Sequence, residues 1–220
     1  MNKKLYFTVD TETLGGAINP KNAYHISGII HDNTGKMYAT CNYLVASMYD
    51  LIRDDEYHKS HFEDYVEMVR TGAVTFMPTI ESAITAIESL LDHYGVEVVM
   101  AYNAGFDLIR GACAPLIENR EFIDLWAMAI ECLVIRKKYT TFCRNNNLKS
   151  SSGKTVSTSA ESVYAYLTNN PDFVERHTAF EDSKIEMEIF LACVKAHKKY
   201  TRNVTAHDAK LLYHLPKMKP

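Results

Sequence analysis

The connection between two extended apolar segments near the start of the chain is the feature that most constrains its fold. Residues 24–30 (YHISGII) and 36–46 (KMYATCNYLVA) are connected by HDNTGK, in which Asp32 and Gly35 are turn-forming residues. An equally apolar segment, residues 4–10 (KLYFTVD), precedes them. We therefore expect the chain to open with an antiparallel meander of three strands.

Helical and extended patterns alternate after this meander. Apolar residues at helical spacing, together with polar or glycine boundaries, predict helices at residues 57–70, 78–95, 106–117, 127–138, 160–170 and 181–200. Short apolar runs predict strands at residues 96–103 and 121–126. A meander that leads into strand–helix alternation is typical of an α/β domain with a mixed sheet.

The length and composition favour one domain spanning residues 1–220. The chain has 220 residues, of which 47% are hydrophobic, enough for a sizeable core. No internal repeat or domain linker is evident. The polar, Gly/Ser-rich stretch at residues 145–159 predicts a loop or exposed hairpin, so we expect an insertion at about 143–160. The carboxyl-terminal tail is basic.

Several features indicate a cytoplasmic protein. No run of about 18 apolar residues is present, so we expect no membrane partner. The amino-terminal apolar run is too short for a signal peptide and ends in acids. The five cysteines are odd in number and none are in C-x-x-C spacing, which favours reduced core thiols. We expect the bacterial cytoplasm, or the host cytoplasm if the source is viral.

The net charge of −3 conceals an asymmetry between two parts of the chain. Residues 1–135 carry 9 Lys+Arg and 19 Asp+Glu, a balance of −10. Residues 136–220 carry 15 Lys+Arg and 8 Asp+Glu, a balance of +7. A basic second part is able to attract a polyanion such as nucleic acid, although an ordinary solvated surface has the same composition.

A strand that ends in two acids is the first candidate site. Asp10 ends the apolar segment at residues 4–10 and Glu12 follows two residues later, and side chains two apart on a strand share a face. Asp54 and Glu56 have the same spacing, but they lie in a polar stretch typical of a solvated surface. Ligand sites in open α/β sheets favour the carboxyl ends of strands. Two close carboxylates repel unless one is protonated or a cation lies between them.

Three further candidates lie where predicted elements begin. Asp107 follows the strand at residues 96–103, and Asp182 lies at the start of the helix at residues 181–200. His177 precedes that helix and is the one histidine of nine with an aspartate five residues later. Taken alone, each acid is also consistent with a helix-start residue that complements the helix dipole, and the histidine with an ordinary surface residue.

Together these positions offer four carboxylates and one imidazole that can face the same sheet edge. Ligand sets made only of oxygen favour hard cations such as Mg²⁺ or Mn²⁺. Two such ions about 4 Å apart suit in-line attack on a phosphodiester. An imidazole nearby accepts a proton near neutral pH. The combination therefore predicts metal-dependent cleavage of phosphodiester bonds.

Three segments carry a family resemblance. FTVDTETLGG, YNAGFD and HTAFED resemble the three motifs of the DEDD 3′–5′ exonucleases, in the histidine-bearing (DEDDh) branch to which RNase T and the bacterial polymerase III proofreading subunit belong. The resemblance spans about residues 5–195, with the motifs in the right order. It implies a ribonuclease-H-like fold, a mixed five-stranded β-sheet flanked by α-helices, and removal of nucleoside 5′-monophosphates from the 3′ end of DNA or RNA.

The resemblance also implies the role of each motif residue. By position in the motifs, Asp10, Glu12, Asp107 and Asp182 match the ligands of two Mg²⁺ or Mn²⁺ ions. His177 matches the general base.

Substrate contacts follow from the same motifs. The residues after the first acids touch the terminal nucleotide in this family, which implies that Thr13 and Leu14 contact the 3′ end and that Asn103 and Phe106 shape that site. Tyr102 stands where many members have histidine, a departure that we expect to alter packing more than chemistry. Leu14 takes a position often held by a small polar residue.

A basic segment with interleaved aromatic residues is a candidate for gripping a single strand. Residues 135–154 contain Arg136, Lys137, Lys138, Arg144, Lys149 and Lys154, with Tyr139 and Phe142 between them. Basic grooves with aromatic stacking residues bind single-stranded nucleic acid. A helix with a solvated face and core aromatics fits the segment equally well.

Some questions stay open at the level of sequence. The residues do not distinguish single-stranded DNA from RNA, because no 2′-hydroxyl contact is identifiable. They leave the oligomeric state undetermined, a homodimer included. One alternative is a non-catalytic nucleic-acid-binding relative, against which the four acids argue because they repel phosphate. The other is a different metal-dependent phosphoesterase, which product analysis would separate from an exonuclease.

Overall fold

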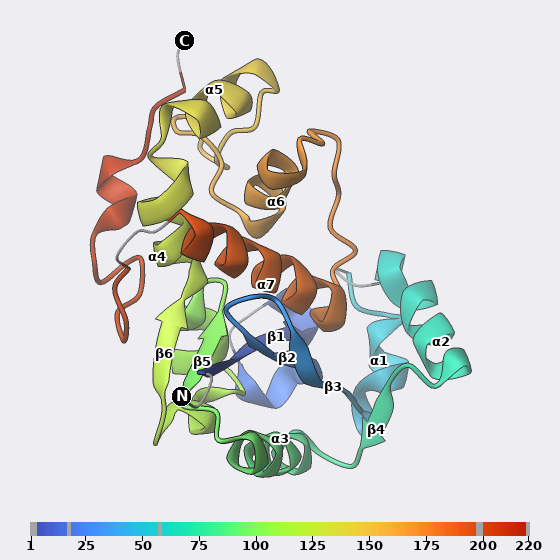
Figure 1. Cartoon of the computed structure of the whole chain (residues 1–220). Helices are drawn as coiled ribbons and strands as arrows, with labels where there is room; N and C mark the ends of the chain where they lie inside the picture. The colour runs from blue at the N-terminus through green and yellow to red at the C-terminus, as the bar shows by residue number, and fades with distance from the viewer. Residues whose placement is uncertain (1–3, 17–18, 57–58, 197–199, 219–220) are drawn as a thin grey trace.

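A six-stranded sheet organises the chain (Figure 1). The computed structural model describes residues 4–16, 19–56, 59–196 and 200–218. The strands lie in the order β4-β3-β2-β1-β5-β6. Their bounds are Leu5–Thr13 for β1, Ala23–Asp32 for β2, Met37–Val45 for β3, Thr75–Met77 for β4, Val98–Ala101 for β5 and Glu121–Asp124 for β6.

The first three strands form the predicted antiparallel meander. In the turn between β2 and β3, the Asp32 carboxylate accepts hydrogen bonds from the backbone N–H groups of Thr34 and Lys36, at 2.7 and 3.3 Å. Gly35 has a φ of +87°, a conformation that glycine adopts without strain. The turn residues therefore close this hairpin as the sequence predicts.

The remaining strands run parallel to their neighbours. β5 pairs with β1 on one side and with β6 on the other, and β4 pairs with β3 at the opposite edge. The mixed α/β class is thus confirmed, but the predicted number of five strands is short by one. The strand that was missed, β4, has three residues and is followed by Pro78, so it is too short to carry a periodic signal.

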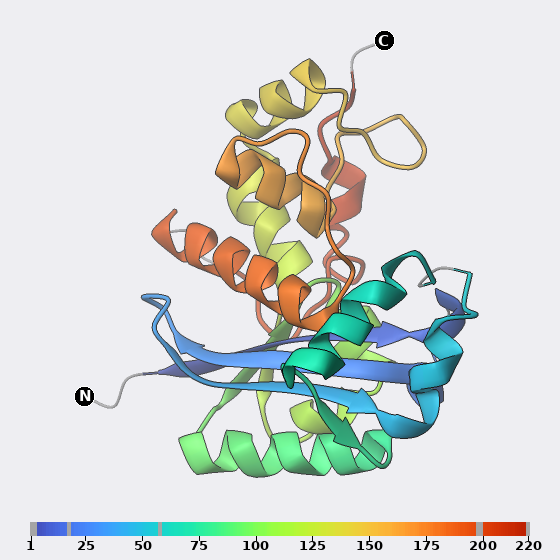
Figure 2. The same ribbon diagram turned by 90° about the vertical axis from the view of Figure 1, so that its right-hand side faces the viewer.

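Helices cover both faces of the sheet (Figure 2). On one face α3, Ile80–Tyr94, buries Ile84, Ile87 and Leu91 against the apolar side chains of β1, β2 and β5. On the other face α7, Ala179–Lys195, crosses β1 and β2. The hydrophobic core therefore has two layers, one on each side of the sheet.

The ends of α3 agree with the sequence. The Thr79 hydroxyl accepts a hydrogen bond from the Ser82 backbone N–H at 3.2 Å, and the Ser82 hydroxyl accepts one from the Thr79 N–H. Gly95 ends the helix with a φ of +64°. A polar cap at the start and a glycine at the end are the kind of boundary from which the helix was predicted.

The continuous helix predicted at residues 106–117 is wrong. The chain instead makes one π-helical turn, Gly105–Ile109, and a 3₁₀ turn, Ala114–Ile117. Between them the chain folds back so tightly that a Cβ on Gly111 would lie 2.2 Å from the Phe106 carbonyl oxygen. Pro115 also lacks the N–H that a continued helix needs. The close approach at glycine and the proline together end the helix after its first turn.

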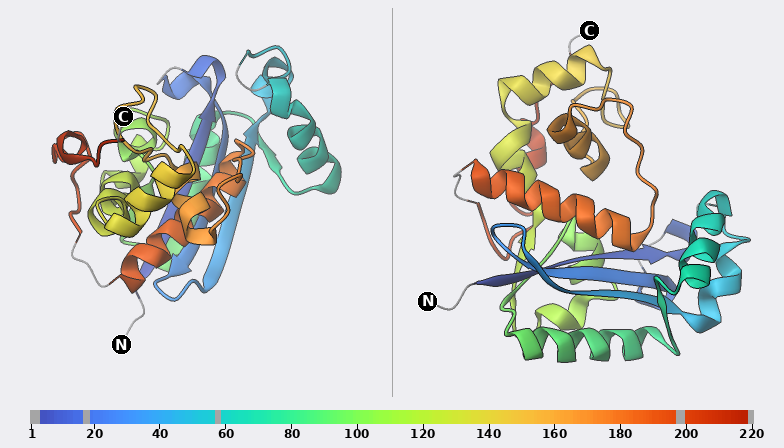
Figure 3. Two further views of the ribbon diagram at one scale, coloured as in Figure 1. Left: turned by 90° about the horizontal axis from the view of Figure 1, so that it is seen from above. Right: turned by 45° about the vertical axis from the view of Figure 1, so that its right-hand side comes forward.

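The other helices lie outside this sandwich (Figures 2 and 3). α1 and α2 lie beside the β3–β4 edge of the sheet. α4 follows directly from β6 and lies beside α7, whereas α5 and α6 lie beyond α7. Their bounds are Tyr49–Ile52 for α1, Phe62–Thr71 for α2, Leu125–Ala129 for α4, Lys137–Asn145 for α5 and Ala160–Thr168 for α6. A π turn, Ile130–Val134, continues α4 and leaves a break before α5 inside the helix predicted at residues 127–138. Between α5 and α6, Lys149 and Val156 pair in an antiparallel bridge.

Some residues of the predicted helices and of the tail are not described by the structure. Residues 57–58 and 197–199, included in the helices predicted at 57–70 and 181–200, lie outside the described residues, as do residues 219–220 of the basic tail. All five cysteines are buried and free, as predicted. Within the described part of the chain, the helices are all too short or too polar to cross a membrane.

Candidate active site

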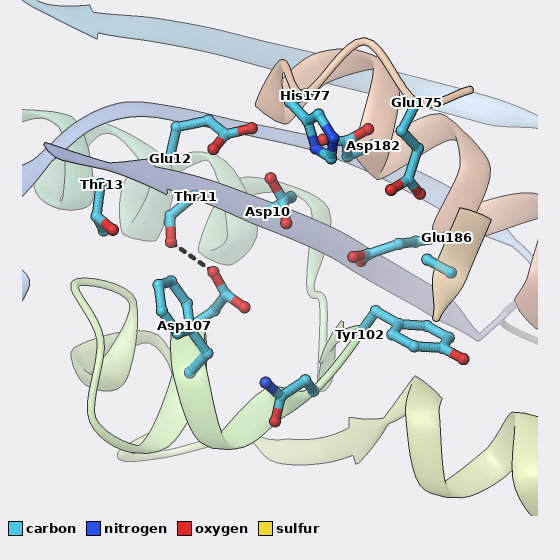
Figure 4. A pocket seen from close by; sticks show the side chains of 13 residues that line it. Asp10, Thr11, Glu12, Thr13, Tyr102, Asp107, Glu175, His177, Asp182 and Glu186 are labelled. Carbon is cyan, nitrogen blue, oxygen red and sulfur yellow. Dashed lines mark hydrogen bonds between the residues drawn. The ribbon is translucent and has the colours of Figure 1, made fainter. Parts of the chain in front are cut away.

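A cavity of about 430 Å³ opens at the carboxyl ends of β1 and β5 and the start of α7 (Figure 4). Its wall is rich in carboxylates. The residues that line it are Asp10, Thr11, Glu12, Thr13, Tyr102, Asn103, Phe106, Asp107, Ala160, Glu175, His177, Asp182 and Glu186. Segments far apart in the sequence thus meet at the sheet edge where ligands of α/β proteins commonly bind.

β1 supplies two of the acids. Asp10 and Glu12 alternate with Thr11, whose side chain lies on the other face of the strand, toward Asp107 (Figure 4). Burial raises the pKa of the Asp10 carboxyl well above its ordinary value, and the nearby carboxylates of Asp107 and Glu186 raise it further. Ligand oxygens of Asp10, Glu12 and Asp182 lie within 4.8 Å of one another, close enough to share one cation.

Asp107 comes from the π turn that follows β5. It is 2% exposed, and the Thr11 hydroxyl donates a hydrogen bond to its Oδ1. Burial raises the pKa of Asp107 to about 7, although the Thr11 hydrogen bond opposes that shift. Asp107 therefore meets β1 at Thr11, next to Asp10, and lies outside the group formed by Asp10, Glu12 and Asp182.

Asp182 lies in the first turn of α7, where its backbone N–H donates to the Thr178 carbonyl at 3.0 Å. Burial raises the pKa of Asp182 to about 7, and the adjacent Glu181 carboxylate adds to the shift. Its Oδ1 is buried and has no hydrogen-bond partner. A buried carboxylate oxygen without a donor is costly, so this atom is suited to a ligand with positive charge.

His177 occupies the loop that enters α7 and points toward the acids (Figure 4). Its φ of +51° is in the left-handed region, which is uncommon for a residue other than glycine. Its ring packs edge-on against His61, with centroids 5.5 Å apart. Burial lowers the pKa of His177, and His61 lowers it further, so its imidazole is neutral at neutral pH. A neutral imidazole at this place is able to accept a proton.

The loop around His177 is held from two sides. The Tyr65 hydroxyl, on α2, donates to the His177 carbonyl at 3.4 Å and lies 3.0 Å from the Tyr24 hydroxyl. The Ala179 N–H donates to Nδ1 of His25 on β2 at 3.3 Å. These contacts tie the strained residue to the sheet and to α2, which is a common way of preserving strain at a functional position.

Two cavity acids, Glu175 and Glu186, were missed in the sequence. Glu186 follows Asp182 by one helical turn, so an acid four residues after Asp182 within an apolar helix face was the available signal. Glu175 precedes His177 by two residues and offered no signal, because its burial depends on the fold. Burial raises the pKa of Glu175 to about 8, and the Asp182 carboxylate adds to this shift. With Glu161 and His177 it forms a second group whose ligand atoms lie within 4.8 Å of one another.

The residues predicted to contact the terminal nucleotide divide into two sets. Thr13, Asn103 and Phe106 line the cavity. Leu14 lies in a 3₁₀ turn and packs against the cluster of Tyr24 and Tyr65, outside the residues that line the cavity.

Tyr102, where many DEDDh members have histidine, has a structural contact. Its hydroxyl donates to the Thr158 carbonyl at 2.5 Å, which ties the end of β5 to the segment before α6. This agrees with the expectation that the departure at this position affects packing.

The basic segment at residues 135–154 is only partly available to a ligand. Tyr139 is fully buried and its hydroxyl donates to the Ser157 carbonyl at 2.9 Å, so of the two alternatives left open for this residue, a core aromatic is the one observed. Phe142 packs on Tyr166. Lys149 lines a groove that adjoins the carboxylate cavity and shares Tyr102, Asn103 and Ala160 with it.

Comparison with known proteins finds a likeness in structure. No family model matches the sequence, and no curated protein matches it. Cell-death related nuclease 4 superposes with a TM-score of 0.52 at 15% identity, over 91% of this chain and 67% of that one. E. coli exonuclease I, in complex with a dA16 oligonucleotide, superposes with a TM-score of 0.51 at 13% identity, over 96% of this chain.

These two nucleases share the fold of the chain. At such identities the likeness is one of fold alone, and the chain spans 43% of the length of E. coli exonuclease I. A second complex of that enzyme, with a 5cy-dA13 oligonucleotide, gives a TM-score of 0.51 at 13% identity, over 87% of this chain and 41% of that one. The expected ribonuclease-H-like arrangement, a mixed sheet flanked by helices, agrees with this likeness and with the observed strand order.

Proposed function

We propose that this chain is a metal-dependent 3′–5′ exonuclease that removes nucleoside 5′-monophosphates from the 3′ end of single-stranded nucleic acid. The observation that carries the proposal is the convergence of Asp10, Glu12, Asp107 and Asp182, with His177 beside them, on one cavity at the sheet edge. The likeness in fold to two nucleases supports it.

The acids suit divalent cations. Burial raises the pKa of each of these four acids, and the neighbouring cavity carboxylates raise those of Asp10 and Glu12 further, so in the absence of a cation the carboxylates are hard to ionise together. The orphaned Oδ1 of Asp182 and the purely oxygen-based ligand set favour Mg²⁺ or Mn²⁺. Asp10, Glu12 and Asp182 would hold one ion, and Asp10 with Asp107 a second. When bound, such ions make water more acidic and neutralise charge on phosphate.

The other residues of the cavity act on the proton and on the strand. His177 accepts the proton of the attacking water, since its lowered pKa keeps it neutral. The Tyr65 hydroxyl holds the His177 backbone and so orients the imidazole. Thr13, Asn103 and Phe106 line the place of the terminal nucleotide, where the Phe106 ring offers a stacking surface.

The substrate class follows from charge and from the neighbouring proteins. E. coli exonuclease I was crystallised with single-stranded oligonucleotides, which supports single-stranded DNA as a substrate. The balance of +7 over residues 136–220 and Lys149 in the adjoining groove would attract the strand. The proposal assigns the activity to a single domain within residues 1–220. Five buried free thiols support a reducing, cytoplasmic compartment.

The experiment that tests the proposal uses 5′-labelled single-stranded DNA and RNA of matched sequence, each with Mg²⁺, with Mn²⁺ and with chelator. A ladder that shortens from the 3′ end, present with metal and lost with chelator, is expected. The faster ladder identifies the preferred strand. Internal fragments without a ladder would reject the exonuclease and favour a nuclease of internal sites.

A further inference from the structure

Glu186 is a buried acid of the cavity, and the proposed mechanism assigns it no role. It lies on α7 one turn after Asp182, and side chains four residues apart on a helix lie on the same face. It is 3% exposed, lines the carboxylate cavity and points into it (Figure 4). Its surroundings therefore resemble those of the motif acids rather than those of an ordinary surface glutamate.

The hydrogen bonding of Glu186 is incomplete. The Tyr102 backbone N–H donates to its carboxylate, but Oε2 is buried and has no partner. Asp124, another buried acid, is 1% exposed and is fully bonded, because its oxygens accept from the N–H groups of Ala104, Trp126 and Ala206. The fold thus satisfies a buried acid that has a structural role, whereas it leaves one oxygen of Glu186, a residue that lines the cavity, without a hydrogen-bond partner.

The neighbours of Glu186 indicate which part of the cavity it serves. Asp10, Glu12 and Asp182 form a compact group that excludes Asp107. Glu186 raises the pKa of Asp10, and Asp107 is the first charged neighbour that raises that of Glu186. Glu186 thus lies near Asp10 and Asp107, the two acids assigned to the second ion (Figure 4).

We propose that Glu186 is a fifth carboxylate of the metal centre, which holds the second divalent cation together with Asp10 and Asp107 before nucleic acid binds. The inference rests on the proposed function in that it takes the four motif acids as metal ligands. With only Asp10 and Asp107, the second ion would depend on the phosphate of the substrate for much of its negative charge. A third carboxylate lets the free protein hold it.

Metal binding without nucleic acid tests this assignment. We would titrate the chelator-treated full chain with Mn²⁺ in a calorimeter and count the ions bound. The wild type is expected to bind two ions. Glu186→Gln, which keeps the size of the side chain and removes its charge, is expected to keep the first ion and to bind the second at least tenfold more weakly. Glu186→Met is likewise expected to keep the first ion and to bind the second at least tenfold more weakly. Glu188→Gln, an exposed acid on the same helix, is the matched control and should bind like the wild type.

The possible outcomes separate this inference from the proposed function. Two ions bound with unchanged affinity by the folded Glu186→Gln variant would overturn the role of Glu186 and leave the nuclease proposal intact. A single ion bound by the wild type would also overturn the role of Glu186 and leave the nuclease proposal intact. No Mn²⁺ binding by the wild type, or no effect of Asp10→Ala on it, would overturn both. Thermal unfolding in chelator checks that each variant is folded, and loss of a buried charge should leave the metal-free fold at least as stable.

Discussion

At the scale of single residues, Asp10 and Asp54 begin the same D-x-E pattern in opposite surroundings. Asp10 lies at the end of a buried strand among other carboxylates, whereas Asp54 is exposed and next to Arg53 on the surface. Spacing alone therefore does not identify a site. The strand before Asp10 is what distinguishes the two pairs, because it places the acids at a sheet edge.

This contrast provides a matched pair of variants. Asp10→Ala should abolish cleavage and leave the protein folded, because removing one acid relieves repulsion in the metal-free cavity. Asp54→Ala should cleave like the wild type. Initial rates on labelled oligonucleotides and thermal unfolding of both variants check this. Near-normal turnover by Asp10→Ala would remove the motif acid from the mechanism.

The imidazole of His177 gives a second prediction at this scale. His177→Ala should slow cleavage by roughly 10²–10⁴-fold, the usual contribution of a general base. Because its pKa is lowered, the wild type should lose activity only at pH values below about 6.5, the ordinary pKa of histidine. The variant should lack this acid limb. His93→Ala, at an exposed position, is the control. An unchanged pH–rate profile in His177→Ala would assign the proton transfer to another group.

Some residues of the cavity can be predicted from the sequence, and others cannot. Asp10 lies in the last part of β1, Asp107 follows β5 and Asp182 lies in the first turn of α7, so local signals place them near one edge of the sheet. The burial of Glu175 depends on how its loop packs after folding, so no local pattern reports it. The sequence left open whether Tyr139 stacks on a nucleic-acid strand or packs in the core, because its neighbours in sequence are basic; it fills the core between α5 and the segment before α6.

At the scale of elements, the meander and α3 follow from local signals, whereas β4 and the turn after β5 do not. The hairpin has turn residues and α3 has a cap at each end, so the sequence defines both. β4 is three residues long and exists because β3 offers an edge to pair with. The π turn Gly105–Ile109 follows from the tight return of the chain at Gly111, which no helical periodicity reveals.

Helix α2 contributes to the site from outside the sheet. Its Tyr65 is fully buried and connects Tyr24 on β2 to the carbonyl of His177. Tyr65→Phe should lower the free energy of unfolding by about 1 kcal/mol, because buried hydrogen bonds are lost. It should also slow single-turnover cleavage, since the His177 loop is less restrained. Tyr213→Phe, at a position that is 84% exposed, is the control. Urea unfolding and single-turnover kinetics check both effects, and an unaltered cleavage rate in Tyr65→Phe would reject the role of α2 in positioning His177.

At the scale of the whole molecule, the cavity acids predict how stability depends on pH. Burial raises the pKa values of Asp107 and Asp182 to about 7 and of Glu175 to about 8, whereas unfolded carboxyls have values near 4. The folded metal-free protein therefore binds more protons than the unfolded chain. This stability is fully present below about pH 4 and is lost as the pH rises through about 7 to 8.

In chelator, the midpoint of thermal unfolding should therefore fall between about pH 7 and 8.5. Each proton that the folded state binds in excess of the unfolded chain lowers the free energy of unfolding by roughly 1.4 kcal/mol for each unit by which the pH rises. Burial lowers the pKa of His25 to about 4, so this residue stabilises the fold above about pH 6.5. Its contribution to the free energy of unfolding is therefore constant in this pH window. Mg²⁺ should reduce the fall, because bound cations compensate the ionised acids. A midpoint that is flat in chelator, or that falls equally with Mg²⁺, would contradict this electrostatic account.

The measurement that tests the central claim most directly compares a linear single strand with a closed circle of the same sequence. An enzyme that removes nucleotides from the 3′ end should convert the linear strand to nucleoside 5′-monophosphates with Mg²⁺, should do nothing in chelator, and should leave the circle intact. Cleavage of the circle at the same rate, or degradation of the linear strand in chelator, would contradict the assignment of a metal-dependent 3′–5′ exonuclease.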